Sequence, residues 1–139
     1  MLNKNSGLLG ISELSNDCRT LESAADEGHE GARHALEVMT YRLAKYNTSM
    51  SVACGGIDAL VFTGGIGENS RNIRAKTVAY LDYLGLHIDT KANMEKRYGN
   101  SGIISPTGSM PAVLVVPTNE ELMIALDTAA LAGFLQEAG

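Results

Sequence analysis

Residues 58–69 read DALVFTGGIGEN, a short apolar run that ends on three glycines within four positions. The run has the β-prone composition of a strand, the glycines are typical of a tight turn, and capping-type residues follow them. We therefore predict a strand, a turn and the start of a helix. Glycines let a ligand approach the main chain, and the first N–H groups of a helix are unpaired and lie at the positive end of its dipole. The turn is a candidate nucleotide site.

The spacing of Gly64, Gly65 and Gly67 matches neither common phosphate-binding fingerprint. It is not G-x-G-x-x-G, and no Lys-Ser or Lys-Thr follows at the Walker spacing. On spacing alone, the three glycines fit a sharp strand-to-helix connection without a ligand equally well. Both interpretations stay open at this point.

The composition is that of one globular domain. The chain has 139 residues, 45% of them hydrophobic, and its mean hydropathy is -0.01. The net charge of -5 argues against a nucleic-acid partner, which usually requires clustered Lys and Arg. No apolar run approaches the roughly 20 residues that span a bilayer, and no signal pattern opens the chain. We expect a cytoplasmic protein without a membrane partner.

The cysteines and histidines show no metal-site or disulfide spacing. Cys18 and Cys54 form no C-x-x-C pair, and His29, His34 and His87 form no H-x-x-x-H pair. We expect two reduced thiols and three ordinary surface or packing histidines.

The apolar spacing along the rest of the chain predicts helices that alternate with strands, as in an α/β fold. The longest predicted helix has one apolar face and is closed by glycines; the face comprises Ala32, Ala35, Met39, Leu43, Tyr46, Met50 and Ala53, and the glycines are Gly55 and Gly56. Further helices are predicted from residue 20, at 70–84, at 91–98 and from 117 to about 134. In the helix at 70–84 the inward residues are Ile73, Thr77, Leu81 and Leu84. A short strand is predicted at 86–88, and runs at 102–105 and 112–116 form a hairpin or two neighbouring strands.

A polar segment precedes the long helix. Residues 12–19 are turn-like and end in Asp17-Cys18-Arg19. From the residues alone, we interpret these three as part of a loop with a capping aspartate and a solvated arginine.

A second candidate group opens the C-terminal helix. Thr118 and Glu121 have the spacing of a capping box, in which each side chain binds a backbone N–H of the other residue. Glu120, at the second helical position, has no such partner and is free to face a ligand or a metal-bound water. The simpler interpretation is two acidic residues in a first helical turn.

These motifs are similar to those of acetate kinases, members of the acetate and sugar kinase, Hsp70 and actin superfamily. VFTGGIGEN at 61–69 and PTNEEL at 117–122 match the family almost letter for letter, and Asp17-Cys18-Arg19 matches its D-x-R element, 46 residues before Gly65. The resemblance covers essentially this whole chain but only about the last third of a complete acetate kinase, so we expect a truncated chain. It implies an α/β fold, the C-terminal part of an actin-like (ribonuclease H-like) ATPase domain with a mixed sheet flanked by helices, as a single domain over residues 1–139.

The resemblance also implies which residues form the site. The nucleotide-binding residues are Asp17, Cys18, Arg19, Gly65, Ile66, Gly67, Glu68 and Asn69, and the metal residue is Glu120. In the family the glycine turn lies along the adenosine half of ATP, which moves the expected ligand from the phosphates towards the nucleoside. The metal is Mg²⁺, with Mn²⁺ as an alternative.

The activity implied is reversible transfer of the ATP γ-phosphoryl group to acetate, giving acetyl phosphate and ADP. The family's asparagine-glycine-serine phosphate element, substrate-side arginines, catalytic aspartate and histidine-containing segment do not occur here, so we expect no catalytic residue in this chain and no activity by it alone. The expected partners are the missing N-terminal part and, at full length, a second copy in a homodimer. The alternatives are a free-standing nucleotide-binding or interaction module without catalysis, and a propionate or butyrate kinase.

Overall fold

A mixed three-stranded sheet lies in the body of the structure. The computed structural model describes residues 5–134. Within them, β1 (Ala59–Phe62) pairs in parallel with β3 (Ala112–Val115), and β2 (Gly102–Ile103) pairs antiparallel with β3, in the order β1-β3-β2. The two β-prone runs therefore form a hairpin, one of the two predicted arrangements. The predicted α/β class with a mixed sheet is confirmed.

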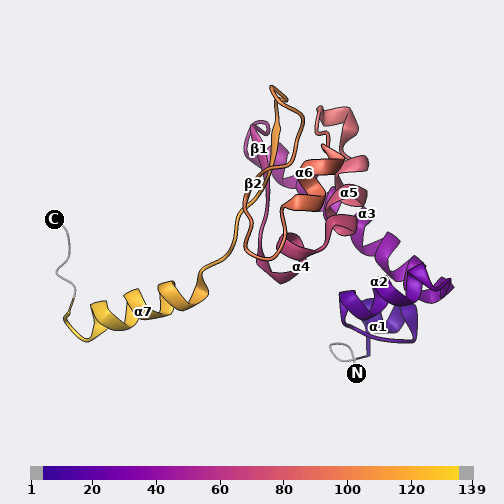
Figure 1. Ribbon diagram of the computed structural model, residues 1–139, viewed down its shortest axis with the longest axis horizontal. Coiled ribbons are helices and arrows are strands. Elements are labelled where there is room, and N and C mark those ends of the chain that lie inside the picture. The colour runs from indigo at the N-terminus through magenta and orange to yellow at the C-terminus, as the bar shows by residue number, and fades with distance from the viewer. Residues whose placement is uncertain (1–4, 135–139) are drawn as a thin grey trace.

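Helices make up most of the remaining described chain. They are α1 (Gly7–Ser12), α2 (Cys18–Asp26), α3 (Glu30–Ala53), α4 (Gly64–Asn69), α5 (Arg71–Ala79), a 3-10 turn (Asp82–Leu84), α6 (Thr90–Glu95) and α7 (Glu120–Leu131). Figure 1 shows α1 and α2 at one end of the long α3, the sheet with α4 to α6 at its other end, and α7 projecting from the body. Across residues 5–134 every helix falls short of the length and apolar character needed to cross a bilayer.

Two apolar clusters hold these elements together. The first lies against one face of the sheet and comprises Ala44, Leu60, Val78, Leu81, Leu86, Ile104, Val113 and Val115. The second joins α2, α3 and α5 and comprises Leu21, Ala32, Ala35, Leu36 and Ile73. Side chains alternate across a strand, so the sheet has a second face, on which Val61 is 49% exposed.

Helix α3 confirms the longest predicted helix and its ending. Gly55 has φ 72°, and the N–H groups of Gly55 and Gly56 donate to the carbonyls of Val52 and Ser51. This pair of hydrogen bonds, with Gly55 in a left-handed conformation, is a Schellman motif, and the predicted closing of the helix by glycines is confirmed.

The predicted apolar face of α3 is buried only in its first half. Ala32 and Ala35 are fully buried, whereas Tyr46 and Met50 are 57% and 58% exposed. The prediction that Tyr46 and Met50 pack inward is wrong for this structure, in which α1 and α2 lie towards the N-terminal end of α3 (Figure 1). Thr40 is buried in their place, and its hydroxyl donates to the Leu36 carbonyl.

The predicted helix at 70–84 is confirmed in its start and its inward face. Ser70 caps α5 by accepting from the Ile73 N–H, and Thr77 and Leu81 are buried. The α-helix ends earlier, at Ala79, and a 3-10 turn continues to Leu84.

The predicted strand at 86–88 is wrong. Burial of Leu86 in the first cluster holds this segment in place, and one backbone bond, from the Asp89 N–H to the Ile104 carbonyl, connects its end to the sheet region. An apolar run thus indicated burial correctly and strand pairing incorrectly, since periodicity over three residues does not distinguish the two.

Candidate functional site

Each glycine of the predicted turn has a different structural situation. Thr63 precedes α4, and Gly64 has φ 70°, a left-handed conformation that favours glycine. A Cβ at Gly67 would lie 3.3 Å from the Phe62 carbonyl carbon, so packing favours glycine there. A Cβ at Gly65 would meet nothing within 4 Å, and Gly65 has an ordinary φ. Among the three, Gly65 alone is a glycine that neither the backbone nor the packing of this chain requires.

The strand, the turn and the helix start predicted at 58–69 are confirmed, but α4 has only six residues. A helix this short gives weak support to an anion site at its N-terminus, because its dipole is small. The open side of Gly65 is therefore the feature that makes the turn a candidate site.

The buried side chain of Arg74 holds α4 in place through hydrogen bonds. Its guanidinium donates to the carbonyls of Gly67 (2.7 Å) and Glu68 (2.8 Å). The same group donates to Asn93 Oδ1 (2.7 Å) and to the carbonyls of Asn93 (2.7 Å) and Lys96 (3.0 Å). Burial lowers the pKa of Arg74, and the neighbouring charge of Arg97 lowers it further. Arg74 thus joins the carbonyl ends of α4 and α6.

Sequence reasoning missed Arg74. The signal that was available is its position on α5, three residues before Thr77 and beside Ile73, both of which were predicted to face inward. An arginine beside the inward face of a helix is normally predicted to be exposed to solvent.

Two predicted nucleotide residues use their side chains to hold the turn itself. The Asn69 amide donates to the Gly65 carbonyl (3.0 Å) and its Oδ1 accepts from the Tyr98 N–H (3.0 Å). Glu68 Oε1 accepts from the Thr118 N–H (2.8 Å) and from the Thr118 hydroxyl (2.9 Å). These two bonds lower the pKa of Glu68, the backbone bond most. The main chain at Gly65 and the exposed side chain of Ile66 are left to face a ligand, whereas Gly67 packs against Phe62 and its carbonyl accepts from Arg74.

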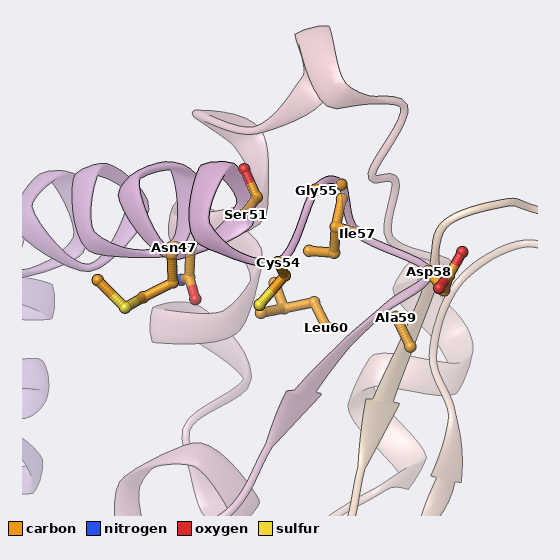
Figure 2. A pocket seen from close by; sticks show the side chains of 10 residues that line it. Asn47, Ser51, Cys54, Gly55, Ile57, Asp58, Ala59 and Leu60 are labelled. Carbon is orange, nitrogen blue, oxygen red and sulfur yellow. The ribbon is translucent and has the colours of Figure 1, made fainter.

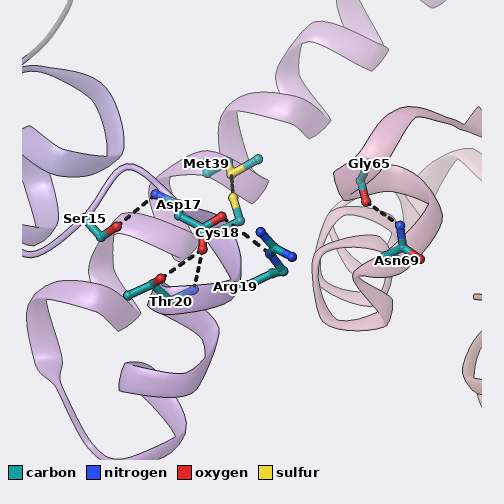
Figure 3. Close-up of polar contacts among 8 residues, drawn as sticks. All are labelled: Ser15, Asp17, Cys18, Arg19, Thr20, Met39, Gly65 and Asn69. Atoms are coloured by element: carbon teal, nitrogen blue, oxygen red, sulfur yellow. Dashed lines mark hydrogen bonds and ion pairs between the residues drawn. The ribbon is translucent and has the colours of Figure 1, made fainter. Parts of the chain in front are cut away.

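Residues 17–19 begin α2, and the aspartate is a cap. Asp17 accepts from the Thr20 N–H (3.1 Å) and the Thr20 hydroxyl (2.9 Å), while the Arg19 side chain is 90% exposed, with its Nε 3.7 Å from the Asp17 carboxylate. The Cys18 side chain is buried against Met39, and burial raises the pKa of its thiol. Figure 3 shows these contacts, with Arg19 on the side of α2 that faces α4 in this view.

One side-chain bond connects α2 to the end of α4. The Ser70 hydroxyl, which caps α5 directly after α4, donates to Glu22 Oε1 of α2 (2.7 Å). Together with the Glu68–Thr118 contact, this bond links α2 and the segment that leads to α7 with the C-terminal end of α4.

The predicted capping box at α7 is wrong. Asn119 caps the helix by accepting from the Leu122 N–H (3.0 Å), because Thr118 is occupied by Glu68. Glu120 is consequently the first helical residue rather than the second, and Glu121 has no capping role. No hydrogen bond or ion pair within residues 5–134 involves the Glu120 carboxylate, so it is free to contact a ligand.

A hollow of about 460 Å³ lies elsewhere, between the C-terminal end of α3 and β1. Figure 2 shows its lining, which includes Ser51, Cys54 and Asp58. It contains none of the predicted site residues. The candidate site is thus an open surface along α4 rather than this hollow.

Comparison with known proteins identifies the group to which this sequence is similar. The model of the acetokinase family matches residues 1–126. Acetate kinase 2 of Neisseria meningitidis serogroup B is 89% identical over 135 residues, which are 97% of this chain and 34% of the relative. The acetate kinase of Chromobacterium violaceum is 64% identical over 96% of this chain and 33% of its own length.

Solved structures show the same similarity in three dimensions. Porphyromonas gingivalis acetate kinase superposes with a TM-score of 0.84 at 43% identity, over 94% of this chain and 32% of that protein. A propionate kinase from Francisella tularensis gives 0.81 at 43% identity, over 90% of this chain and 31% of that one. The prediction of an acetate kinase-type, actin-like α/β fold is confirmed. This chain spans about a third of the length of these relatives.

Proposed function

Because the chain belongs to the acetokinase family, we propose that it forms the nucleotide side of an enzyme that transfers the ATP γ-phosphoryl group to acetate. The reaction is reversible and gives acetyl phosphate and ADP. Residues 1–139 form one domain in this proposal, and the whole enzyme is cytoplasmic. At full length it is a homodimer.

The observation that carries the proposal is the open side of Gly65. Gly64 and Gly67 are explained by the backbone and by Phe62, but no described neighbour lies within 4 Å of a Cβ at Gly65. A glycine without a structural requirement, fixed in place by Arg74 and Asn69, suits the close approach of a flat or extended ligand to the main chain. The nucleoside of ATP is the proposed occupant.

The exposed groups around the turn have roles that fit this ligand. Arg19 is the cation of the site and lies on the nucleotide side. Asp17 holds the first turn of α2, and Cys18 contributes its backbone, because its thiol is buried. Glu68 and Asn69 hold the turn in shape.

Glu120 is the proposed ligand of Mg²⁺, or of Mn²⁺ in its place. A single free carboxylate fits this metal, which is commonly held by one or two carboxylates, water and substrate phosphates rather than by a full protein cage. Residues 5–134 contain no cluster of three or more metal-binding side chains, in keeping with such a site. When bound, the metal neutralises charge on the phosphates.

The acceptor side lies in the part of the enzyme outside this chain. The acetate kinase of P. gingivalis and the propionate kinase of F. tularensis are both 43% identical to this chain, in keeping with an acyl pocket elsewhere. Phosphoryl transfer requires donor and acceptor to be held in line. We therefore expect no acetyl phosphate from this chain alone.

Calorimetric titration with Mg-ADP tests the nucleotide site. We expect weak binding by the chain and loss of heat in Gly65→Val and in Arg19→Ala, because the first fills the open side and the second removes the cation. Arg33→Ala is the matched control, since Arg33 is an exposed arginine that pairs with Glu30 on α3. Unchanged titrations in both site variants would contradict the proposal.

A hydroxamate assay for acetyl phosphate tests the division of the enzyme. With acetate, Mg-ATP and the purified chain, the signal should equal that of a control without protein. Adding the separately expressed remainder of a relative's enzyme should restore turnover where the two parts associate. Turnover by the chain alone that Glu120→Ala abolishes would place the acceptor site within these residues.

A further inference from the structure

The glycine turn and Glu120 follow two parallel strands that end at the same edge of the sheet. Phe62, the last residue of β1, is paired with Val115, and its carbonyl also accepts from the Val116 N–H (3.0 Å). The chain leaves β1 directly into α4 and leaves β3 directly towards α7. Ligands of open α/β sheets bind outside the carboxyl ends of parallel strands.

One side chain of α4 bridges the two connections. Glu68 Oε1 accepts from both the N–H and the hydroxyl of Thr118, 50 residues away. The backbone of Glu68 is fixed in turn, because buried Arg74 donates to its carbonyl and to that of Gly67. The contact therefore joins a firmly held helix to the start of a projecting one.

We infer that Glu68 is a positioning residue whose carboxylate, by holding Thr118, sets where the Glu120 carboxylate lies relative to the Gly65 turn. The inference rests on the proposed function, since it assigns Glu68 to the coupling of nucleotide and metal rather than to either ligand.

The distances along the chain make this coupling tight. Glu120 follows Thr118 by two residues, a span of at most about 7 Å. The intervening Asn119 is fixed as well, because its side chain caps α7 at the Leu122 N–H. A displacement of Thr118 should therefore move Glu120 by a similar distance. Hydrogen bonds to an ionised acceptor are about twice as strong as those between neutral groups. The two bonds from Thr118 to the Glu68 carboxylate, called the latch below, are therefore suited to an exposed site.

The role differs from that expected from sequence. Glu68 was predicted to bind the nucleotide, but its Oε1 already has two donors from Thr118. Removing the carboxylate should therefore weaken the metal-dependent part of binding and leave the contacts of the Gly65 main chain in place.

Matched variants distinguish loss of the Glu68–Thr118 hydrogen bonds from loss of the negative charge of Glu68. Glu68→Leu removes the acceptor, whereas Glu68→Gln keeps a carbonyl oxygen that accepts from both donors. Thr118→Val removes the hydroxyl, whereas Thr118→Ser keeps it. ADP affinity is measured for each variant by calorimetry with Mg²⁺ and with a chelator.

We expect Mg²⁺ to strengthen ADP binding in the unmodified chain, in Glu68→Gln and in Thr118→Ser. In Glu68→Leu the affinities with and without Mg²⁺ should agree within about twofold, because the coupling free energy between the two ligands is lost. Thr118→Val should be intermediate, since its N–H still donates. The inference is overturned by a full Mg²⁺ effect in Glu68→Leu, or by an equal loss of metal-free affinity.

A measurement without nucleotide keeps the inference separate from the proposed function. Backbone ¹⁵N relaxation should show faster local motion at Thr118 and Glu120 in Glu68→Leu than in Glu68→Gln. Equal backbone motion at Thr118 and Glu120 in the two variants overturns the inference, even if ADP binds. Absence of ADP binding by the unmodified chain, with the expected relaxation difference, would refute the proposed function and leave the latch supported.

Discussion

Replacing the glycines of α4 one at a time by alanine should have opposite effects at neighbouring positions. At Gly65 the new Cβ meets nothing within 4 Å and φ is ordinary, so Gly65→Ala should gain roughly 0.5–1 kcal/mol of helix stability. At Gly64, with φ 70°, alanine should lose roughly 1–2 kcal/mol. At Gly67 the contact of 3.3 Å with the Phe62 carbonyl carbon should cancel the gain.

Urea unfolding followed by circular dichroism measures these differences as free energies. In thermal unfolding, Gly65→Ala should raise Tm by about 2–5 °C for a domain of this size. The same variant should bind ADP more weakly, so that stability and binding change in opposite directions. If Gly65→Ala were destabilised as much as Gly64→Ala, Gly65 would have a structural requirement and the reasoning from its open side would be refuted.

Three further outcomes are expected. Arg74→Met should destabilise the chain by about 3 kcal/mol or more in urea unfolding, because five hydrogen bonds, buried or partly buried, to α4 and α6 lose their donor, and an unchanged midpoint would contradict this role. The Thr20 hydroxyl and N–H lower the pKa of Asp17, so this cap contributes stability above the unfolded pKa of about 3.9 and loses it as the pH falls through the folded value. Asp17→Asn should accordingly show a flatter acid limb in a plot of Tm against pH, and an unaltered limb would count against the cap. Finally, the chain should self-associate in sedimentation through exposed apolar residues of α7, and Ile124→Glu with Leu131→Glu should shift it towards monomer; a monomer at high concentration before substitution would refute this expectation.

Local sequence rules predicted those features whose causes are local. The glycine turn after β1 and the Gly55–Gly56 ending of α3 follow from backbone conformations that few other residues adopt. The start of α5 at Ser70 follows from an N-cap hydroxyl.

Contacts distant in sequence decided the features that were missed. Thr118 and Asn119 are both good caps, and Asn119 takes the role because Glu68, 50 residues away, engages Thr118. The burial of Arg74 depends on carbonyls of two helix ends that meet only in the fold. Periodicity identified the apolar face of α3 but does not show how much of that face other elements cover. Tyr46 is therefore exposed where we expected it to pack inward.

The most direct test of the account is the set of backbone amide signals that ADP shifts in a ¹H–¹⁵N spectrum of this chain. If α4 is the nucleotide site, the largest shifts should occur at Gly64 to Asn69 and at Arg19, and they should disappear in Gly65→Val while the remaining spectrum is retained. Shifts confined to the hollow between α3 and β1, at Ser51, Cys54 and Gly55, would place the nucleotide elsewhere and contradict the account.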